Sequence, residues 1–350
     1  MGDVSMETVI MYALFALGII LIVKGADWFV DGAAWVAEVT GIPKFIVGAT
    51  IISVATTLPE LFISSMAAVE GHEILLSGAG DFLFQAGEKI GLAIGNGIGS
   101  VICNTAMIMA LSVVFAPSKV DIVKFTPKAI LLGVALAAVM ILTRNGVLPT
   151  KNSIILLAIF AAFIIENIKG AKRDSFDDED PPPSDRKTVI RNILGIVLGG
   201  LAVVVGSRLI VNNGSEIASS WGVSEGIVGV TMIAVGTSLP ELVTAVSAII
   251  KKQPAMSVGN IIGANIIDTV LIFPICSLIY GGMLPISDQN LYLDFPVAAI
   301  VSVIALVPTV IGKRFYRWQG VLMLLIYAVY IAIVSLYLDS YLAIVNSFIG

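Results

Sequence analysis

The stretch "IVGATIISVATTLPEL", residues 46–61, occurs a second time in the chain as "IVGVTMIAVGTSLPEL", residues 227–242. The two copies are identical at eleven of sixteen positions, at a constant offset of 181 residues. A second matched pair follows, "GNGIGSVICNT" at 95–105 and "GNIIGANIIDT" at 259–269. Two motif pairs in the same order indicate that the chain is an internal duplication, so the fold is one half used twice.

The composition predicts an integral membrane protein. Of the 350 residues, 57% are hydrophobic and 13% are charged, whereas soluble proteins carry about 25% charged residues. Apolar stretches close to the ~20 residues that a helix needs to span a bilayer recur along the whole chain. We predict an all-α protein with ten transmembrane helices, at roughly 7–36, 44–69, 90–115, 127–143, 152–168, 190–220, 226–250, 256–282, 293–312 and 318–345.

The duplication gives five spans in each half. Because five is odd, the second half enters the membrane in the opposite sense, which predicts two inverted-topology five-helix repeats. The predicted divisions are 1–168 for the first repeat (motifs 46–65 and 95–105), 169–189 for an acidic, proline-containing linker, and 190–350 for the second repeat (motifs 227–246 and 259–269). The first repeat also carries an insertion at about 70–88, for which a re-entrant or interfacial segment is one interpretation.

The basic residues predict the orientation. Lys and Arg accumulate in cytoplasmic loops, and fifteen of the twenty lie on one side if the N-terminus is outside. We therefore expect a multi-pass protein of the cell membrane with both termini outside and the linker 169–189 in the cytoplasm. For "DDED" in that linker, a solvated tether is favoured over a calcium-binding segment.

Two glutamates stand at membrane depth. An ionised side chain there costs at least ~2.5–3.5 kcal/mol, so Glu60 and Glu241 need a partner or a function. Neither motif contains Lys, Arg or His. A protonated structural carboxyl group is the alternative for one glutamate, but two at matched positions favour cation binding. Asp27 and Arg208 also occupy matched positions, and either pair with each other or lie solvated near helix ends.

Other oxygen atoms accompany the glutamates. Pro59 and Pro240 each remove a backbone donor inside a helix, so we expect a broken helix at each proline, with carbonyl oxygens freed one turn earlier. Hydroxyl groups lie at the same level, on Thr56, Thr57, Thr237 and Ser238. An all-oxygen set suits Ca²⁺, which accepts 6–8 such ligands, while zinc and copper prefer His or Cys. The second motif pair adds Ser100, Asn104 and Asp268.

The motifs "ATTLPEL", "GTSLPEL", "GNGIGSVICN" and "GNIIGANIID" resemble the two α-repeats of the cation/calcium exchanger superfamily, closest to its sodium/calcium exchanger branch. The resemblance covers nearly the whole chain. It implies that spans 2, 3, 7 and 8 hold the ions, and that spans 1 and 6 slide to alternate access.

The resemblance also implies roles for individual residues. Ca²⁺ would be bound by Glu60 and Glu241 with the carbonyl groups of Thr56 and Thr237. Sodium would be bound at flanking positions by Thr57, Ser100 and the Ser53 carbonyl on one side, and by Ser238 and the Ala234 carbonyl on the other, with Asn104 and Asp268 completing the middle.

The sequence departs from the family pattern at four positions. Ala55 replaces a glycine, Thr57 a serine, and Ser53 an alanine. Ala264 stands where a serine hydroxyl usually helps to bind sodium. These departures leave the coupling ion and the stoichiometry open.

We predict an antiporter that exchanges Ca²⁺ for Na⁺ by alternating access, with proton- or potassium-dependent exchange as the alternative and a cation channel as a weaker one. An enzyme is not expected, since the chain has no H-E-x-x-H motif, no phosphate-loop lysine motif and one histidine. No cofactor, nucleic acid or protein partner is expected, and a monomer is sufficient. The substrates are Ca²⁺ and Na⁺, and the lipid bilayer is the solvent.

Overall fold

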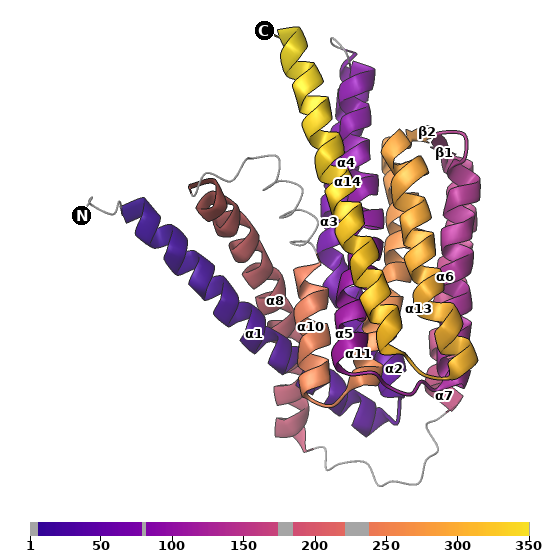
Figure 1. Cartoon of the computed structure of the whole chain (residues 1–350). Coiled ribbons are helices and arrows are strands. Elements are labelled where there is room, and N and C mark those ends of the chain that lie inside the picture. The colour runs from indigo at the N-terminus through magenta and orange to yellow at the C-terminus, as the bar shows by residue number, and fades with distance from the viewer. Residues whose placement is uncertain (1–5, 79–81, 174–184, 221–237, 350) are drawn as a thin grey trace.

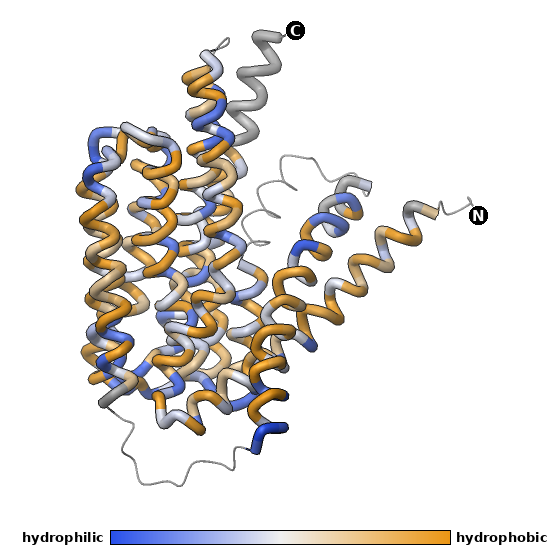
Figure 2. Tube along the Cα trace, turned by 180° about the vertical axis from the view of Figure 1, so that it is seen from behind, coloured by the Kyte–Doolittle hydropathy of each residue, from blue (hydrophilic) through white to orange (hydrophobic). Residues whose placement is uncertain are grey.

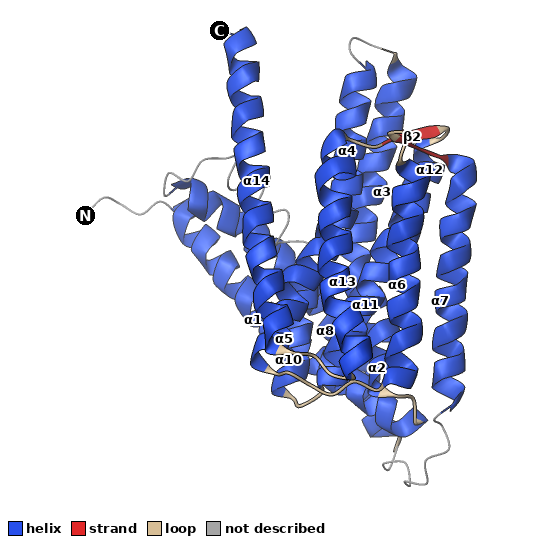
Figure 3. Cartoon of the chain, turned by 45° about the vertical axis from the view of Figure 1, so that its right-hand side comes forward, coloured by secondary structure: helices blue, strands red, loops and turns tan. Residues whose placement is uncertain are grey.

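The computed structural model describes residues 6–78, 82–173, 185–220 and 238–349. These residues form helices joined by short connections (Figures 1 and 3). The first repeat contains α1 (Met6–Thr40), α2 (Lys44–Val47), the π-helical η1 (Gly48–Ile52), α3 (Ser53–Ser77), α4 (Phe82–Cys103), the π-helical η2 (Asn104–Met109), α5 (Ala110–Phe115), α6 (Ile122–Thr143), β1 (Val147–Pro149), the 3₁₀ turn η3 (Thr150–Asn152) and α7 (Ser153–Arg173). The second contains α8 (Arg186–Ser220), α10 (Leu239–Ile250), α11 (Pro254–Ile267), the π-helical η4 (Asp268–Ile272), α12 (Phe273–Tyr280), β2 (Met283–Pro285), the π-helical η5 (Asn290–Asp294), α13 (Phe295–Gly312) and α14 (Arg317–Ile349).

The all-helical membrane fold is confirmed. Within the described ranges, nine helical stretches are long and apolar enough to cross a membrane, and α10 is a shorter apolar helix. Their apolar residues run along most of each helix (Figure 2). Helix α10 belongs to the seventh predicted span, whose first part, 226–237, lies outside the described residues.

Helices α1 and α8 form a pair that leans away from the main bundle (Figure 1). Glycine permits this close contact, because a Cβ atom built on Gly199 would lie 2.6 Å from the Gly25 carbonyl oxygen. A Cβ atom built on Gly206 would lie 2.8 Å from the Gly18 carbonyl oxygen. At the offset of 181 residues, Gly18 corresponds to Gly199 and Gly25 to Gly206. The contact of Gly18 with Gly206 is therefore equivalent to the contact of Gly199 with Gly25.

The second span crosses α11 at the centre of the bundle. A Cβ atom on Gly259 would lie 2.1 Å from the Phe45 carbonyl oxygen, and one on Gly48 would lie 2.2 Å from the Met256 carbonyl oxygen. Any side chain at these positions would push the two backbones apart. This crossing brings the first "IVG" motif, residues 46–48, against the second "GN" motif, residues 259–260. It also positions the carboxylates described below.

Three features differ from the sequence-based expectations. The insertion lengthens a helical hairpin, because α3 continues to Ser77 and α4 begins at Phe82; Lys89 Nζ lies 2.6 Å from Glu70 Oε2 across this hairpin. The helical ends of α7 and α8 extend into the predicted linker 169–189, of which residues 174–184 lie outside the described residues. A short antiparallel strand pair, β1 with β2, joins the two halves at one end (Figure 3).

Candidate ion-binding site

Three buried carboxyl groups come from different helices. Glu60 lies in α3, Glu241 in the first turn of α10, and Asp268 at the first residue of η4. Each is 1% exposed. Glu60 interacts electrostatically with both Glu241 and Asp268, and Asp268 with Glu241. Like charges at this depth are unfavourable unless protons or cations neutralise them.

The protein itself supplies no counter-charge in the described part of the chain. None of the ion pairs there involves Glu60, Glu241 or Asp268. The Thr56 hydroxyl is a neutral neighbour that interacts with the Glu241 carboxylate.

Unsatisfied polar atoms gather on the same helices. Within the described ranges, both carboxylate oxygens of Glu60, one of Glu241 and one of Asp268 are buried without a hydrogen-bond partner. The same holds for the hydroxyls of Thr57, Ser100 and Ser238 and for both side-chain amide atoms of Asn104. Buried polar groups are normally paired, so these atoms are available to bind a ligand, and the oxygen atoms among them suit a cation.

Asn104 and Asp268 have equivalent local structure. Each is the first residue of a π-helical segment, η2 and η4 respectively. The two residues are matched in the second motif pair. Single π-helical turns occur frequently at functional sites, because the extra residue disturbs the regular hydrogen-bond ladder. The repeat therefore builds the same irregularity on both sides of the site.

The proline at position 59 does not interrupt its helix. Pro59 lies inside the continuous helix α3, and the irregular segment η1 precedes it at Gly48–Ile52. The expectation of a broken helix at Pro59 is therefore wrong, although the proline still leaves the Ala55 carbonyl oxygen without its usual donor. In the second half Pro240 lies in the first turn of α10, where a missing donor costs nothing.

Two asparagines that the site prediction omitted support its geometry. Asn96 Nδ2 donates to the Glu60 carbonyl oxygen at 3.1 Å and to Ser64 Oγ at 2.9 Å. Its repeat counterpart Asn260 accepts from Thr56 Oγ1 at 3.4 Å and donates to Thr244 Oγ1 at 3.2 Å. The signal was present in the sequence, since both occupy the second position of the "GN" motifs.

The predicted residues divide into three groups. The structure brings Glu60, Glu241 and Asp268 close enough to interact electrostatically, and it places Thr56 beside the Glu241 carboxylate and Ser238 beside Cys103 of α4. It buries Ser53, Thr57, Ser100 and Asn104 on the neighbouring turns of α3, α4 and η2. Thr237 and Ala234 lie outside the described residues.

The donor set decides which metal could bind. Among the described residues, no three His, Cys, Asp or Glu side chains converge as a metal-ligand group. A cation would therefore be held by carboxylates together with hydroxyl and carbonyl oxygens. Such a mixed oxygen shell suits Ca²⁺ and Na⁺ better than zinc or copper. The described residues of this site are at most 2% exposed.

Comparisons with known proteins agree with this fold. The family described as "Sodium/calcium exchanger protein" matches residues 10–169 and 191–336. The chain is similar to the sodium/calcium exchanger MaX1 of Methanosarcina acetivorans, at 25% identity over 92% of this chain and 97% of that protein. It is also similar to the inner membrane protein YrbG of Escherichia coli, at 31% identity over 83% and 86% of the two chains.

A solved structure shows the same fold. The sodium-calcium exchanger NCX_Mj, soaked with Na⁺ and Sr²⁺, matches with a TM-score of 0.77 and 28% sequence identity over 93% of this chain and 98% of its own. The family match covers both repeats and most of the chain. This protein is therefore a multi-pass membrane transporter, not an enzyme, and it belongs to the sodium/calcium exchanger protein family.

Proposed function

We propose that this protein is an antiporter that exchanges Ca²⁺ for Na⁺. The observation that carries the proposal is the pair Glu60 and Glu241, buried without a counter-charge in the described part of the chain and surrounded by unsatisfied oxygen atoms. Two carboxylates offset the charge of one Ca²⁺. Relatives named as sodium/calcium exchangers in the family support the choice of ions.

The ligands would divide between the two ions. Ca²⁺ is held by Glu60 and Glu241 with the carbonyl oxygens of Thr56 and Thr237. Sodium occupies flanking positions, formed by Thr57, Ser100 and Ser53 on one side and by Ser238 and Ala234 on the other. Asn104 and Asp268 lie between these positions. The two ions compete for shared oxygen atoms, so that binding of one displaces the other.

Exchange requires the closed site to open alternately to the two faces. The close α1–α8 pair leans away from the main bundle (Figure 1) and contacts it through α10, α2, η1 and α3. It slides as one unit across the site once the site is occupied. Both termini lie outside the cell, and the linker at 169–189 lies in the cytoplasm.

The test is calcium-45 uptake into proteoliposomes under separately imposed sodium, potassium and proton gradients. Sodium-driven uptake is expected, and it should be lost in Glu60→Gln and in Glu241→Gln. The matched control is Glu88→Gln, at an exposed position of α4. Intact uptake in both site variants would overturn the site.

Proton-dependent exchange is the second candidate function, since Ala264 lacks the hydroxyl that the family pattern places there and a third carboxyl group, Asp268, is available to carry a proton. Uptake driven by protons alone would replace sodium with protons as the coupling ion. Calcium flux that needs no opposing gradient would instead indicate a channel.

A further inference from the structure

A fourth buried carboxyl group lies away from the candidate ion-binding site. Asp294 ends η5 at the start of a span, Asn290–Gly312, and is 1% exposed. Asn290 Nδ2 donates to Asp294 Oδ2 at 2.7 Å, and the Tyr330 hydroxyl donates to Oδ1 at 3.1 Å. The carboxyl group is thus fixed by two neutral partners from two helices.

No described positive charge faces Asp294. Segment η5 packs on α4 and α13, and α13 contains no charged or titratable side chain. Tyr330 of α14 is the titratable group in contact with Asp294, and Gln289 is a further neutral neighbour. Tyr327 of α14 and Cys103 of α4 interact with Tyr330 in turn. The nearest lysine along α4, Lys89, is six residues before Gly95 and is paired with Glu70.

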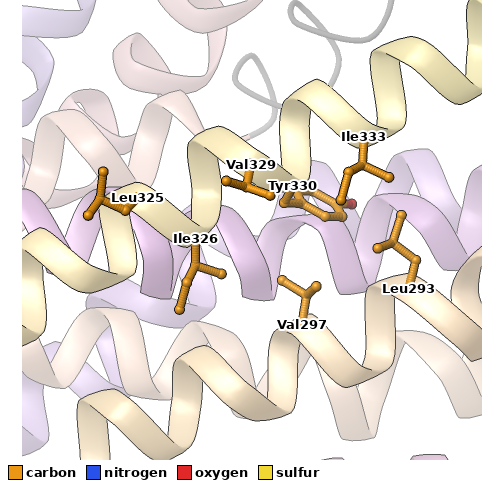
Figure 4. A pocket seen from close by; sticks show the side chains of 7 residues that line it. All are labelled: Leu293, Val297, Leu325, Ile326, Val329, Tyr330 and Ile333. Carbon is orange, nitrogen blue, oxygen red and sulfur yellow. The ribbon is translucent and has the colours of Figure 1, made fainter.

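The surroundings are apolar on the side of Tyr330. Tyr330 lines a cavity of about 230 Å³ together with six leucine, isoleucine and valine side chains (Figure 4). Leu293 and Val297, one residue before and three after Asp294, belong to this lining. An ionised carboxylate is unfavourable in such an environment, whereas a neutral carboxyl group is tolerated.

The hydrogen bonds fit a proton better than a metal ion. When the carboxyl group is protonated at Oδ1, the Tyr330 hydroxyl changes from donor to acceptor, and Oδ2 still accepts from the Asn290 amide, so both partners remain in use. A metal ion would need further oxygen atoms, and Asn290 Oδ1 already accepts from Ser287 Oγ at 2.8 Å. The described residues also hold no convergent group of three acidic, histidine or cysteine side chains here.

The site is connected to solvent at the end of the molecule that carries β1 and β2. Ser287 is exposed, and its hydroxyl also accepts from the Asn290 backbone nitrogen at 3.1 Å. On its other side, the Asn290 amide approaches α4: a Cβ atom built on Gly95 would lie 4.0 Å from Asn290 Nδ2. Helix α4 also carries Ser100 of the candidate ion-binding site.

We propose that Asp294, held by Asn290 and Tyr330, is a proton-binding site separate from the candidate ion-binding site and accessible to solvent from the β1–β2 end. This assignment is independent of which ions the protein exchanges. The Asp294 carboxyl group, where α4, α13 and α14 meet, keeps its proton at neutral pH.

Infrared spectroscopy of the full chain tests this directly, because a protonated carboxyl group has its own C=O stretching band. At neutral pH, the difference spectrum between wild type and Asp294→Asn should contain one such band, which heavy water shifts. Asp288→Asn is the matched control, since Asp288 is an exposed acid in the same connection, and it should retain the band. Superimposable spectra of wild type and Asp294→Asn would overturn the proposal.

A second variant keeps the test decisive if Asp294→Asn does not fold. Tyr330→Phe removes one hydrogen bond from the carboxyl group but leaves its proton in place, so the band should shift without disappearing. An unshifted band in Tyr330→Phe would overturn the assignment. So would a loss of sodium-22 or rubidium-86 binding in Asp294→Asn without loss of a carboxyl band, because the site would then take a metal ion.

Discussion

Lys251 at the end of α10 is bound to Asp31 of α1, with 2.5 Å between Nζ and Oδ1. The same ammonium group donates to the Asp27 carbonyl oxygen at 3.1 Å and lies 3.8 Å from Asp27 Oδ1. Ser247 Oγ donates to Asp27 Oδ1 at 3.1 Å. Asp27 therefore does not pair with Arg208, one of the two alternatives that its repeat position suggested. It ties α1 to the main bundle at one face.

The repeat relation predicts a counterpart of this tie. At the offset of 181, Asp27 corresponds to Arg208 of α8, and Lys251 corresponds to Glu70 of α3. The charges are reversed between the two pairs. We expect Arg208 to bind Glu70 when the α1–α8 pair moves to the opposite access state, in which Lys251 releases Asp27 and Asp31.

Neutralising the two ties should therefore have opposite effects. Lys251→Gln should shift the balance of access states away from the one described here, and Arg208→Gln should shift it toward that state. Asp31 is partly exposed, so each tie contributes up to ~1 kcal/mol, or about a fivefold change in the balance. The balance of access states would be measured by the accessibility of an introduced cysteine to a labelling reagent from each side of the membrane.

A charge exchange provides the control. The double variant Lys251→Asp with Asp31→Lys should restore the balance that Lys251→Asp alone disturbs. Equal shifts of the same sign in Lys251→Gln and Arg208→Gln would contradict the predicted counterpart.

Asn96 should affect ion affinity without carrying charge. In Asn96→Ala, the Glu60 carbonyl oxygen and Ser64 lose their amide donor, and leaving a buried group unpaired costs about 1–3 kcal/mol. We expect calcium affinity to fall about tenfold, measured by calcium-45 binding. Asn213→Ala is the control, because that buried amide donates to its own helix at Leu209. Equal affinities in the two variants would contradict this role.

Ala264 should limit sodium binding. The residue is fully buried in α11, one turn before Asp268, so Ala264→Ser adds a single hydroxyl facing the same side of the helix. We expect the sodium concentration for half-maximal exchange to fall by up to about tenfold. Ala135→Ser in α6, also fully buried, should leave it unchanged. A sodium dependence unaffected by Ala264→Ser would place the missing oxygen elsewhere.

Gly199 should be essential for the α1–α8 contact. Valine there would clash with the Gly25 carbonyl oxygen and with Phe29, whose backbone nitrogen lies 2.7 Å from the built Cβ atom. Overpacking of this kind costs about 1–3 kcal/mol. We expect Gly199→Val to lower thermal stability in detergent and to slow exchange, while Gly133→Val, where a Cβ atom meets nothing within 4 Å, should do neither.

The residues predicted from the sequence are those that occur at matched positions in both copies of a motif. Glu60 and Glu241 could be identified because two matched carboxylates at membrane depth have no ordinary structural reason. Asn96 and Asn260 were equally matched, but an asparagine beside glycines is also typical of helix packing, so the pattern did not separate the two roles.

Other features had no signal of this kind. The π-helical turns at Asn104 and Asp268 depend on one extra residue per turn, which side-chain pattern does not encode. The hydrogen bond between Asp294 and Tyr330 joins residues from different spans that no motif repeats. The extension of α3 to Ser77 is accompanied by long-range contacts such as that of His72 Nδ1 with the Tyr280 carbonyl oxygen, at 2.7 Å.

The glycine contacts between α1 and α8 bear on the direction of transport. Because the duplication exchanges the Gly18–Gly206 and Gly25–Gly199 contacts, this interface has no intrinsic forward or reverse sense. A displacement toward one face and the reverse displacement meet the same pair of glycine contacts. A carrier built on such an interface is thermodynamically reversible, and the electrochemical gradients of its ions, rather than its scaffold, determine the direction in which each transported cation crosses the membrane.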